Sequence, residues 1–152
     1  MNFYDLIRSG ELEDIKEMVQ DDPDLVHTKD PKGFPPLILA SYTDQIEVAE
    51  YLLDQGAAID DQDAAGNTAL MGVCFKGNTE IAQMLIDRGA DVNKRNFSNA
   101  TALIFAATFG QPEIAKLLLE NGADKSAKDN EGNTAADQAR ARGLDDVAEL
   151  VS

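Results

Sequence analysis

Residues 66–98 read GNTALMGVCFKGNTEIAQMLIDRGADVNKRNFS. Apolar residues recur in this stretch at helical spacing, first around Leu70 and Val73 and then, after a glycine break, from Ile81 onward. Gly89 is expected to end the second helix, because glycine readily adopts the left-handed conformation common at helix C-termini. The residues that follow are rich in Gly, Asp and Asn, a composition typical of turns. The stretch therefore predicts two short helices and a turn-forming connection.

Copies of this stretch lie on both sides of it, in steps of 33 residues. One copy begins at Gly33, another at Asn99, and a shortened copy begins at Gly132. The recurring columns are Leu37, Leu70 and Leu103; Ala49, Ala82, Ala115 and Ala148; and Gly56, Gly89 and Gly122. One copy buries too little apolar surface to fold alone, so neighbouring copies must stack to complete a core.

The order of features within a copy resembles the ankyrin repeat. An opening glycine, a tetrapeptide with Thr first and Leu third, an Ala-rich helix, a Leu-rich helix and Gly-Ala-Asp follow one another. The resemblance implies an all-α solenoid of stacked helix-turn-helix repeats joined by turn or hairpin loops, with a cap at each end. We expect one domain over residues 1–152: an N-terminal cap (1–32) with helices near 3–8 and 12–20, full repeats at 33–65, 66–98 and 99–131, and a C-terminal cap (132–152).

The chain departs from the family pattern at several positions. The family tetrapeptide ends in His, whereas the residues here are Ile38, Met71, Ile104 and Asp137. In its missing tetrapeptide histidines and its small number of repeats, the chain is similar to bacterial ankyrin proteins. Thr68, Thr101 and Thr134 are still expected to cap their helices through their hydroxyl groups. Asp44 and Asn99 replace turn glycines, and Asp and Asn are the non-glycine residues that best tolerate positive φ.

Composition excludes several classes of function. The 152 residues carry a formal net charge of −15, which argues against nucleic-acid binding because that requires clustered positive charge. No apolar run reaches the roughly 18 residues needed to span a membrane. The first residues lack the pattern of a signal peptide, so we expect a cytoplasmic protein without membrane contact. One Cys and one His exclude an internal disulfide and a Cys/His metal site.

No catalytic, metal or cofactor site is predicted. Residues 72–79 imitate the phosphate-binding loop GxxxxGK[ST], but Asn78 stands where the lysine must be, so a helix end is the better interpretation. Cys74 lies in a small-residue column of the first helix and is expected to be buried. His27 is expected to hydrogen-bond within a turn. The carboxylates of the second helices are interpreted as a solvated outer face.

Three aspartates at equivalent turn positions are interpreted as structural. Their side-chain oxygens are expected to accept hydrogen bonds from nearby backbone N–H groups. These residues are Asp30, Asp63 and Asp129.

The family resemblance implies that partners bind the concave side, made of turn tips and first helices. Five of the nine aromatic residues map to columns expected to be exposed on that side, and exposed aromatics are typical of protein-binding hot spots. The candidate partner-binding residues are Phe34, Tyr42, Thr43, Asn67, Phe75, Lys76, Phe97, Thr108, Phe109 and Arg142. The exposed columns also include Lys32 and Ala100, and Lys29, Arg95 and Lys128 lie beside them. An alternative stays open, in which Tyr42 and Phe75 turn inward as additional core.

We therefore expect a monomeric, non-enzymatic module that binds an unidentified protein through a concave, aromatic and mildly basic face. An alternative is an inhibitory or immunity-type subunit that masks a basic enzyme, with the acidic body steering the encounter.

Overall fold

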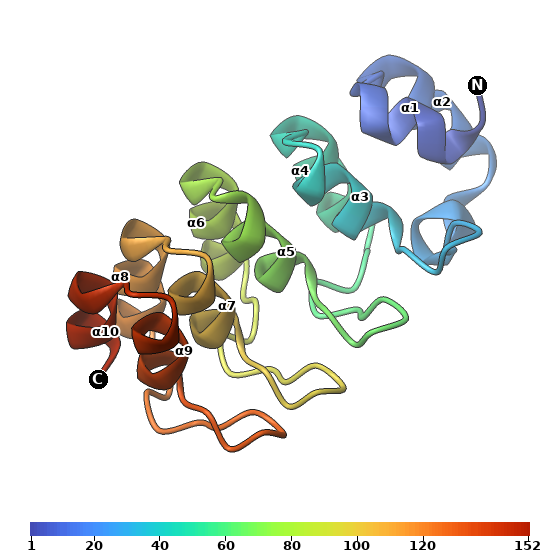
Figure 1. The fold of residues 1–152 in the computed structure, drawn as a ribbon. Helices are drawn as coiled ribbons and strands as arrows, with labels where there is room; N and C mark the ends of the chain where they lie inside the picture. Colours follow the sequence, from blue (N-terminus) through green and yellow to red (C-terminus); the bar gives the residue numbers. More distant parts are fainter.

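A computed structural model describes residues 1–152, and it folds as a row of helix pairs with loops that project to one side (Figure 1). The elements are α1 (Phe3–Ser9), α2 (Leu12–Asp21), the 3-10 helix η1 (Pro23–His27), α3 (Pro36–Tyr42), α4 (Ile46–Asp54), α5 (Ala69–Lys76), α6 (Thr79–Asp87), α7 (Ala102–Thr108), α8 (Pro112–Glu120), α9 (Ala135–Ala141) and α10 (Asp145–Val151).

The helices form two layers. The first helices of successive pairs, α1, α3, α5, α7 and α9, pack side by side, and each also contacts the second helix of its own pair. Long hairpin-like loops leave the row between pairs, all on the same side of the molecule (Figure 1). The model contains no strands, so the predicted all-α solenoid is confirmed.

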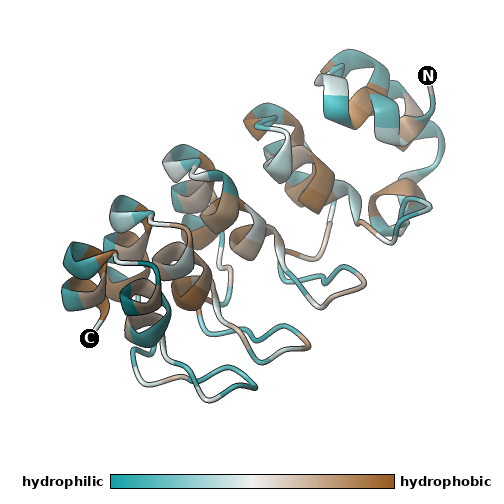
Figure 2. Cartoon of the chain, viewed as in Figure 1, coloured by the Kyte–Doolittle hydropathy of each residue, from teal (hydrophilic) through white to brown (hydrophobic).

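The core runs through the whole row. A single cluster of buried apolar side chains extends from Phe3 to Val151, as stacking of incomplete units requires. The recurring alanine of the second helices is fully buried in each full repeat, where a larger side chain would hold the helices apart. In Figure 2 the hydrophobic colour gathers on helix surfaces that face neighbouring helices, and the hydrophilic colour gathers on loops and outward surfaces.

The local signals at helix ends behave as predicted. The Thr68, Thr101 and Thr134 hydroxyls each accept a hydrogen bond from the backbone N–H three residues on, at 3.2–3.3 Å. Asp44 and Asn99 adopt positive φ, at 63° and 59°. The equivalent helix start in the first full repeat, at Pro35, has no side-chain cap.

Side chains at one column tie each loop to the next. The Lys29 ammonium donates to the Gln62 carbonyl oxygen at 3.1 Å, and the Gln62 amide donates to the Arg95 carbonyl at 3.0 Å. Arg95 in turn donates to the Lys128 carbonyl at 2.9 Å. Each donor thus bonds to the residue 33 positions later, which holds the loops in register along the row.

The prediction for His27 is wrong. It is the exposed last residue of η1, and its side chain makes no hydrogen bond. Compared with the repeat pattern, the N-terminal cap carries one extra residue around Asp21 to Pro23. The chain turns once more there as a 3-10 helix, and the imidazole then faces solvent. Thr28 makes the turn contacts instead: its hydroxyl donates to the Leu25 carbonyl at 2.7 Å and accepts from the Tyr4 hydroxyl at 2.9 Å.

None of the helices is both long enough and apolar enough to cross a lipid bilayer.

Candidate functional site

Aromatic rings line the C-terminal ends of three adjacent first helices. The rings of Tyr42 on α3 and Phe75 on α5 are stacked, with centroids 6.1 Å apart and planes 12° apart. Phe109, which ends α7, meets Phe75 edge to face at 4.7 Å and stacks on Phe105 at 6.1 Å. The repeat period explains the row, because Tyr42 and Phe75 occupy the same column and Phe109 the next one. We call Tyr42, Phe75, Phe105 and Phe109 the aromatic row.

Apart from Met1, the exposed large apolar side chains are Tyr42 (41% exposed), Phe75 (45%), Phe97 (68%) and Phe109 (41%). Tyr42, Phe75 and Phe109 belong to the aromatic row, whereas Phe97 lies in the loop between α6 and α7. The alternative that Tyr42 and Phe75 turn into the core is therefore wrong. Their rings contact each other across the outside of α3 and α5 and leave nearly half of their surfaces to solvent.

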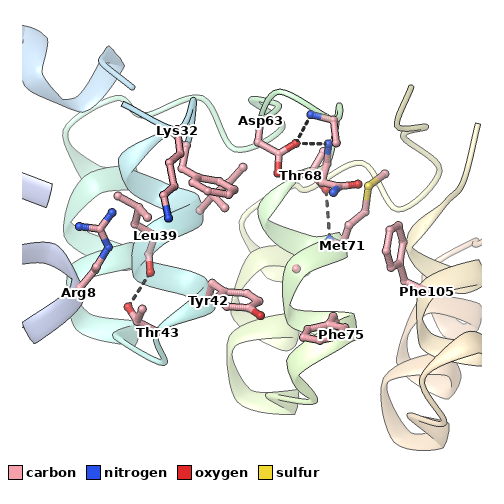
Figure 3. A pocket seen from close by; sticks show the side chains of 15 residues that line it. Arg8, Lys32, Leu39, Tyr42, Thr43, Asp63, Thr68, Met71, Phe75 and Phe105 are labelled. Atoms are coloured by element: carbon pink, nitrogen blue, oxygen red, sulfur yellow. Dashed lines mark hydrogen bonds between the residues drawn. The ribbon is translucent and has the colours of Figure 1, made fainter. Parts of the chain in front are cut away.

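A groove of about 690 Å³ lies beside the aromatic row. Pockets of a few hundred to a thousand Å³ commonly hold ligands. In Figure 3, Leu39 and Tyr42 come from α3 and Thr43 follows it directly, Met71 and Phe75 come from α5, and Phe105 comes from α7. The lining residues are Arg8, Lys32, Phe34, Ile38, Leu39, Tyr42, Thr43, Asp63, Ala65, Asn67, Thr68, Met71, Gly72, Phe75 and Phe105.

The structure divides the sequence-predicted residues between this groove and its surroundings. Those that line the groove are Phe34, Tyr42, Thr43, Asn67 and Phe75, and those outside it are Lys76, Phe97, Thr108, Phe109 and Arg142. Lys76 stays next to the aromatic row, with its ammonium 5.1 Å from the centroid of the Tyr42 ring, within cation–π range. Whether these residues bind a partner stays a prediction.

The expected exposure of one column, which contains Phe34 and Ala100, needs correction. Phe34 is half-buried and packs against the core, and Ala100 is only 9% exposed. Their column lies where the loop returns to the first helix, so the side chains pack under the loop instead of facing solvent.

Three predicted polar contacts are also half-buried, and their polar groups are engaged within the chain. The Thr43 and Thr108 hydroxyls donate to the carbonyl oxygens four residues earlier, at 2.6 and 2.7 Å, as threonines in helices often do. The Asn67 side-chain oxygen accepts a hydrogen bond from the Asn96 amide at 2.9 Å. These three side chains contribute to the shape of the surface, but their bonded polar groups are already used within the chain.

Sequence reasoning missed the apolar wall of the groove. Ile38, Leu39, Met71 and Phe105 are not among the predicted partner-binding residues, yet all four line the groove. The signal that could have identified Phe105 is its position four residues before Phe109, because residues at that spacing lie on the same helix face.

Most cations on this side are engaged within the chain. Lys29 and Arg95 donate to backbone carbonyls, as described above, and Arg142 donates to the Gln138 side chain at 2.7 Å. Arg8 pairs with the buried Asp30 carboxylate at 2.7 Å. Lys32 lines the groove, and its ammonium group makes no hydrogen bond or ion pair within the chain.

The turn aspartates behave as predicted. One carboxylate oxygen of Asp63 accepts hydrogen bonds from the backbone N–H groups of Ala65 and Asn67, both at 2.9 Å. Asp30 and Asp129 make the same pair of bonds at 2.9–3.0 Å.

Cys74 is fully buried, as predicted, and burial raises the pKa of its thiol. A buried thiol of raised pKa is a poor nucleophile, which fits a packing role.

Comparison with known proteins assigns the architecture to a family. Residues 4–96 match the family model described as "Ankyrin repeats (3 copies)", and residues 85–139 match "Ankyrin repeats (many copies)". The chain therefore belongs to the ankyrin repeat family. Ankyrin repeats are generally protein–protein interaction modules and typically carry no catalytic activity.

One curated human protein also matches, "DNA-binding protein RFXANK", at 39% identity over 57 residues. The match covers 38% of this chain and 22% of the human protein. The chain thus spans about a fifth of the length of this relative.

Proposed function

We propose that this protein binds a partner protein through its concave face, with the aromatic row and the groove as the contact surface. The observation that carries the proposal is the position of the exposed rings: apart from Met1, three of the four exposed large apolar side chains lie in the aromatic row, and the fourth, Phe97, lies in the loop between α6 and α7. Exposed apolar patches on soluble proteins commonly mark interaction sites.

The loop hydrogen bonds support a rigid binding surface. Besides the side-chain ladder, the Phe97 N–H donates to the Ala65 carbonyl at 3.1 Å, and the Asn130 N–H donates to the Ser98 carbonyl at 3.0 Å. A surface that is ordered before binding loses little conformational entropy on association. About 800 Å² per partner would then suffice for a specific complex.

The expected partner is a protein and not a nucleic acid. The human relative is DNA-binding by its printed name, but it matches this chain over 57 residues only. A net charge of −15 opposes approach to phosphate groups.

The test compares the wild type with Phe75→Ala/Phe109→Ala and with Tyr51→Ala. Tyr51 lies on α4, in the outer layer, so its truncation removes a ring from another surface. Each protein is immobilised and exposed to lysate of the source cells, and retained proteins are identified by mass spectrometry. We expect a protein that is retained by the wild type and Tyr51→Ala and lost with the double variant, while all three melt cooperatively. Tyr51→Ala should melt at a lower temperature, because the Tyr51 ring packs against the core. Equal retention by all three would contradict the proposed face.

A second candidate function is inhibition of a basic enzyme, which the net charge of −15 favours. Electrostatic steering predicts an association rate that falls steeply as salt rises from about 0.05 to about 0.5 M, whereas binding through aromatic anchors predicts a weak dependence. Stopped-flow measurement with the captured partner would distinguish the two.

A further inference from the structure

The turn aspartates differ in what their second carboxylate oxygen contacts. Oδ2 of Asp30 accepts a hydrogen bond from Arg8 at 2.7 Å, and Oδ2 of Asp129 accepts one from the Gln138 amide at 2.9 Å. In the second full repeat the residue is Asn96, whose amide donates to Asn67. Among the turn aspartates, only Asp63 has a second oxygen without a hydrogen-bond partner, although the residue is only 9% exposed.

The repeat period explains why this oxygen lacks a partner. Arg8 precedes Asp30 by 22 residues, and the residue that precedes Asp63 by 22 is Ser41. Gln138 follows Asp129 by nine residues, and the residue that follows Asp63 by nine is Gly72. Serine is too short to replace the arginine, and its own hydroxyl is buried without a partner. Glycine has no side chain at all.

One of these small residues, Gly72, leaves open space in front of Asp63. Gly72 and Asp63 both line the groove, together with the rings of Tyr42, Phe75 and Phe105. Figure 3 shows the Asp63 carboxylate at the loop end of the groove, with one oxygen bonded to backbone nitrogen atoms and the other turned toward the helices. The groove therefore combines aromatic walls with a carboxylate oxygen that lacks a donor, on a residue that is only 9% exposed.

We propose that an arginine side chain of the partner protein enters this groove and donates to the free oxygen of Asp63, with its guanidinium against the aromatic rings. This inference rests on the proposed function and specifies what the concave face recognises. A planar guanidinium stacks on aromatic faces and forms charge-assisted hydrogen bonds to carboxylates, a combination that fits arginine better than lysine. The net charge of −15 favours the approach of a cationic segment.

Two native cations lie near the path of the incoming group. Arg8 is neutralised by Asp30 at 2.7 Å and by Asp5 at 3.3 Å. Lys32 is unpaired and opposes a second positive charge, so Lys32→Ala is expected to strengthen arginine binding a few-fold.

Two variants that copy residues from equivalent positions of other repeats should block arginine binding. Asp63→Asn removes the charge but keeps an oxygen for the loop N–H groups, as Asn96 already does at 2.9 Å. Gly72→Gln places an amide where Gln138 satisfies Asp129, and a Cβ at Gly72 would be in ordinary contact, 3.7 Å from the Tyr42 ring.

Asp129→Asn is the matched control. It makes the same chemical change at the equivalent position of the third full repeat, where Gln138 already donates to the second oxygen. The new amide requires the Gln138 amide to rotate away from Arg142, so a small loss of stability is expected, whereas the groove is not expected to respond.

The experiment uses a library of seven-residue peptides with a fixed central arginine and random flanks, passed over immobilised wild-type protein. Retained peptides are resynthesised with arginine or with citrulline, its neutral analogue, and dissociation constants are measured by fluorescence anisotropy. We expect citrulline to weaken binding at least about tenfold. Asp63→Asn and Gly72→Gln should each remove the preference for arginine, and Asp129→Asn should retain it.

Several outcomes would overturn the inference: no retained peptide, equal affinity for arginine and citrulline, or a preference that survives in both blocking variants. Failure of the arginine inference is distinguishable from failure of the proposed function. Peptides that ignore the citrulline exchange but lose affinity for Phe75→Ala/Phe109→Ala would leave the concave face in place as the binding surface.

Discussion

Gly66 and Gly132 occupy the same turn column and share a φ of 82°, but their neighbours differ. A Cβ at Gly66 would lie 2.6 Å from both the backbone nitrogen and a ring carbon of Phe97, whereas a Cβ at Gly132 would have no atom within 4 Å. The positive φ makes both positions unfavourable for alanine, and only Gly66 adds a collision with the next loop.

We expect Gly132→Ala to lower the free energy of unfolding by about 1 kcal/mol, the cost of a left-handed conformation. Gly66→Ala should cost at least about twice as much, because the Phe97 backbone must also move. Urea unfolding of both variants measures the difference. Equal decreases in the free energy of unfolding would show that the Phe97 backbone can move at little cost and that neighbouring loops are not closely packed.

Ser41 offers a stability gain at a single residue. Its hydroxyl is buried without a partner, and the equivalent residue in the third full repeat is Ala107. Ser41→Ala removes the unsatisfied group without changing the packing volume much, so the free energy of unfolding should rise by about 1 kcal/mol. A loss of stability would indicate that the hydroxyl has a partner, such as an internal water molecule.

At the scale of the element, helix α9 carries a pH-dependent cap. The Thr134 backbone N–H donates to the Asp137 carboxylate at 2.9 Å, and the Asp137 N–H donates to the Thr134 hydroxyl at 3.2 Å. Hydrogen bonds from the Thr134 backbone, then those with its side chain, lower the pKa of Asp137. A carboxyl whose pKa is lower in the folded state stabilises the fold above its unfolded pKa of about 3.9 and loses that contribution as pH falls through the lower folded value.

Asp137→Asn should therefore be less stable than the wild type near neutral pH, and the two should converge as pH falls below about 4. Thermal melts of both proteins across that range measure the effect. A stability difference that stays constant down to the acid limit would show that the charge of Asp137 does not contribute.

Elements were predictable where local sequence determines them. Gly77 ends α5 in the left-handed conformation, and Thr68 begins it with a side-chain cap, and both are visible without a structure. Helix η1 was not predictable, because it depends on one inserted residue before Pro23. The groove was not predictable either. The second carboxylate oxygen of Asp63 is seen to lack a hydrogen-bond donor only when the side-chain contacts of equivalent residues are compared between repeats. Those contacts cannot be deduced from the sequence of a single repeat.

At the scale of the whole molecule, the helix pairs are not packed evenly. The outer helices α6, α8 and α10 contact one another in sequence, and α10 also reaches α7. The N-terminal cap joins the row mainly through contacts of α1 and η1 with α3. Figure 1 shows the same trend, with the helix pairs closest together at the C-terminal end. In a linear array each repeat is stabilised only by its neighbours, so uneven packing implies uneven local stability.

The first full repeat combines this looser packing with weaker helix ends. Its first helix starts at Pro35 without a side-chain cap, and Asp44 takes a positive φ that glycine takes at Gly77. Native-state hydrogen exchange should therefore give lower opening free energies for amides of α3 and α4 than for those of α7 and α8, by about 1 to 2 kcal/mol. Both helix pairs are internal, so fraying of chain ends does not enter the comparison. Asp44→Gly should narrow the gap by relieving the backbone strain; uniform protection along the row, or weaker protection in α7 and α8, would contradict this account of how the repeats share their stability.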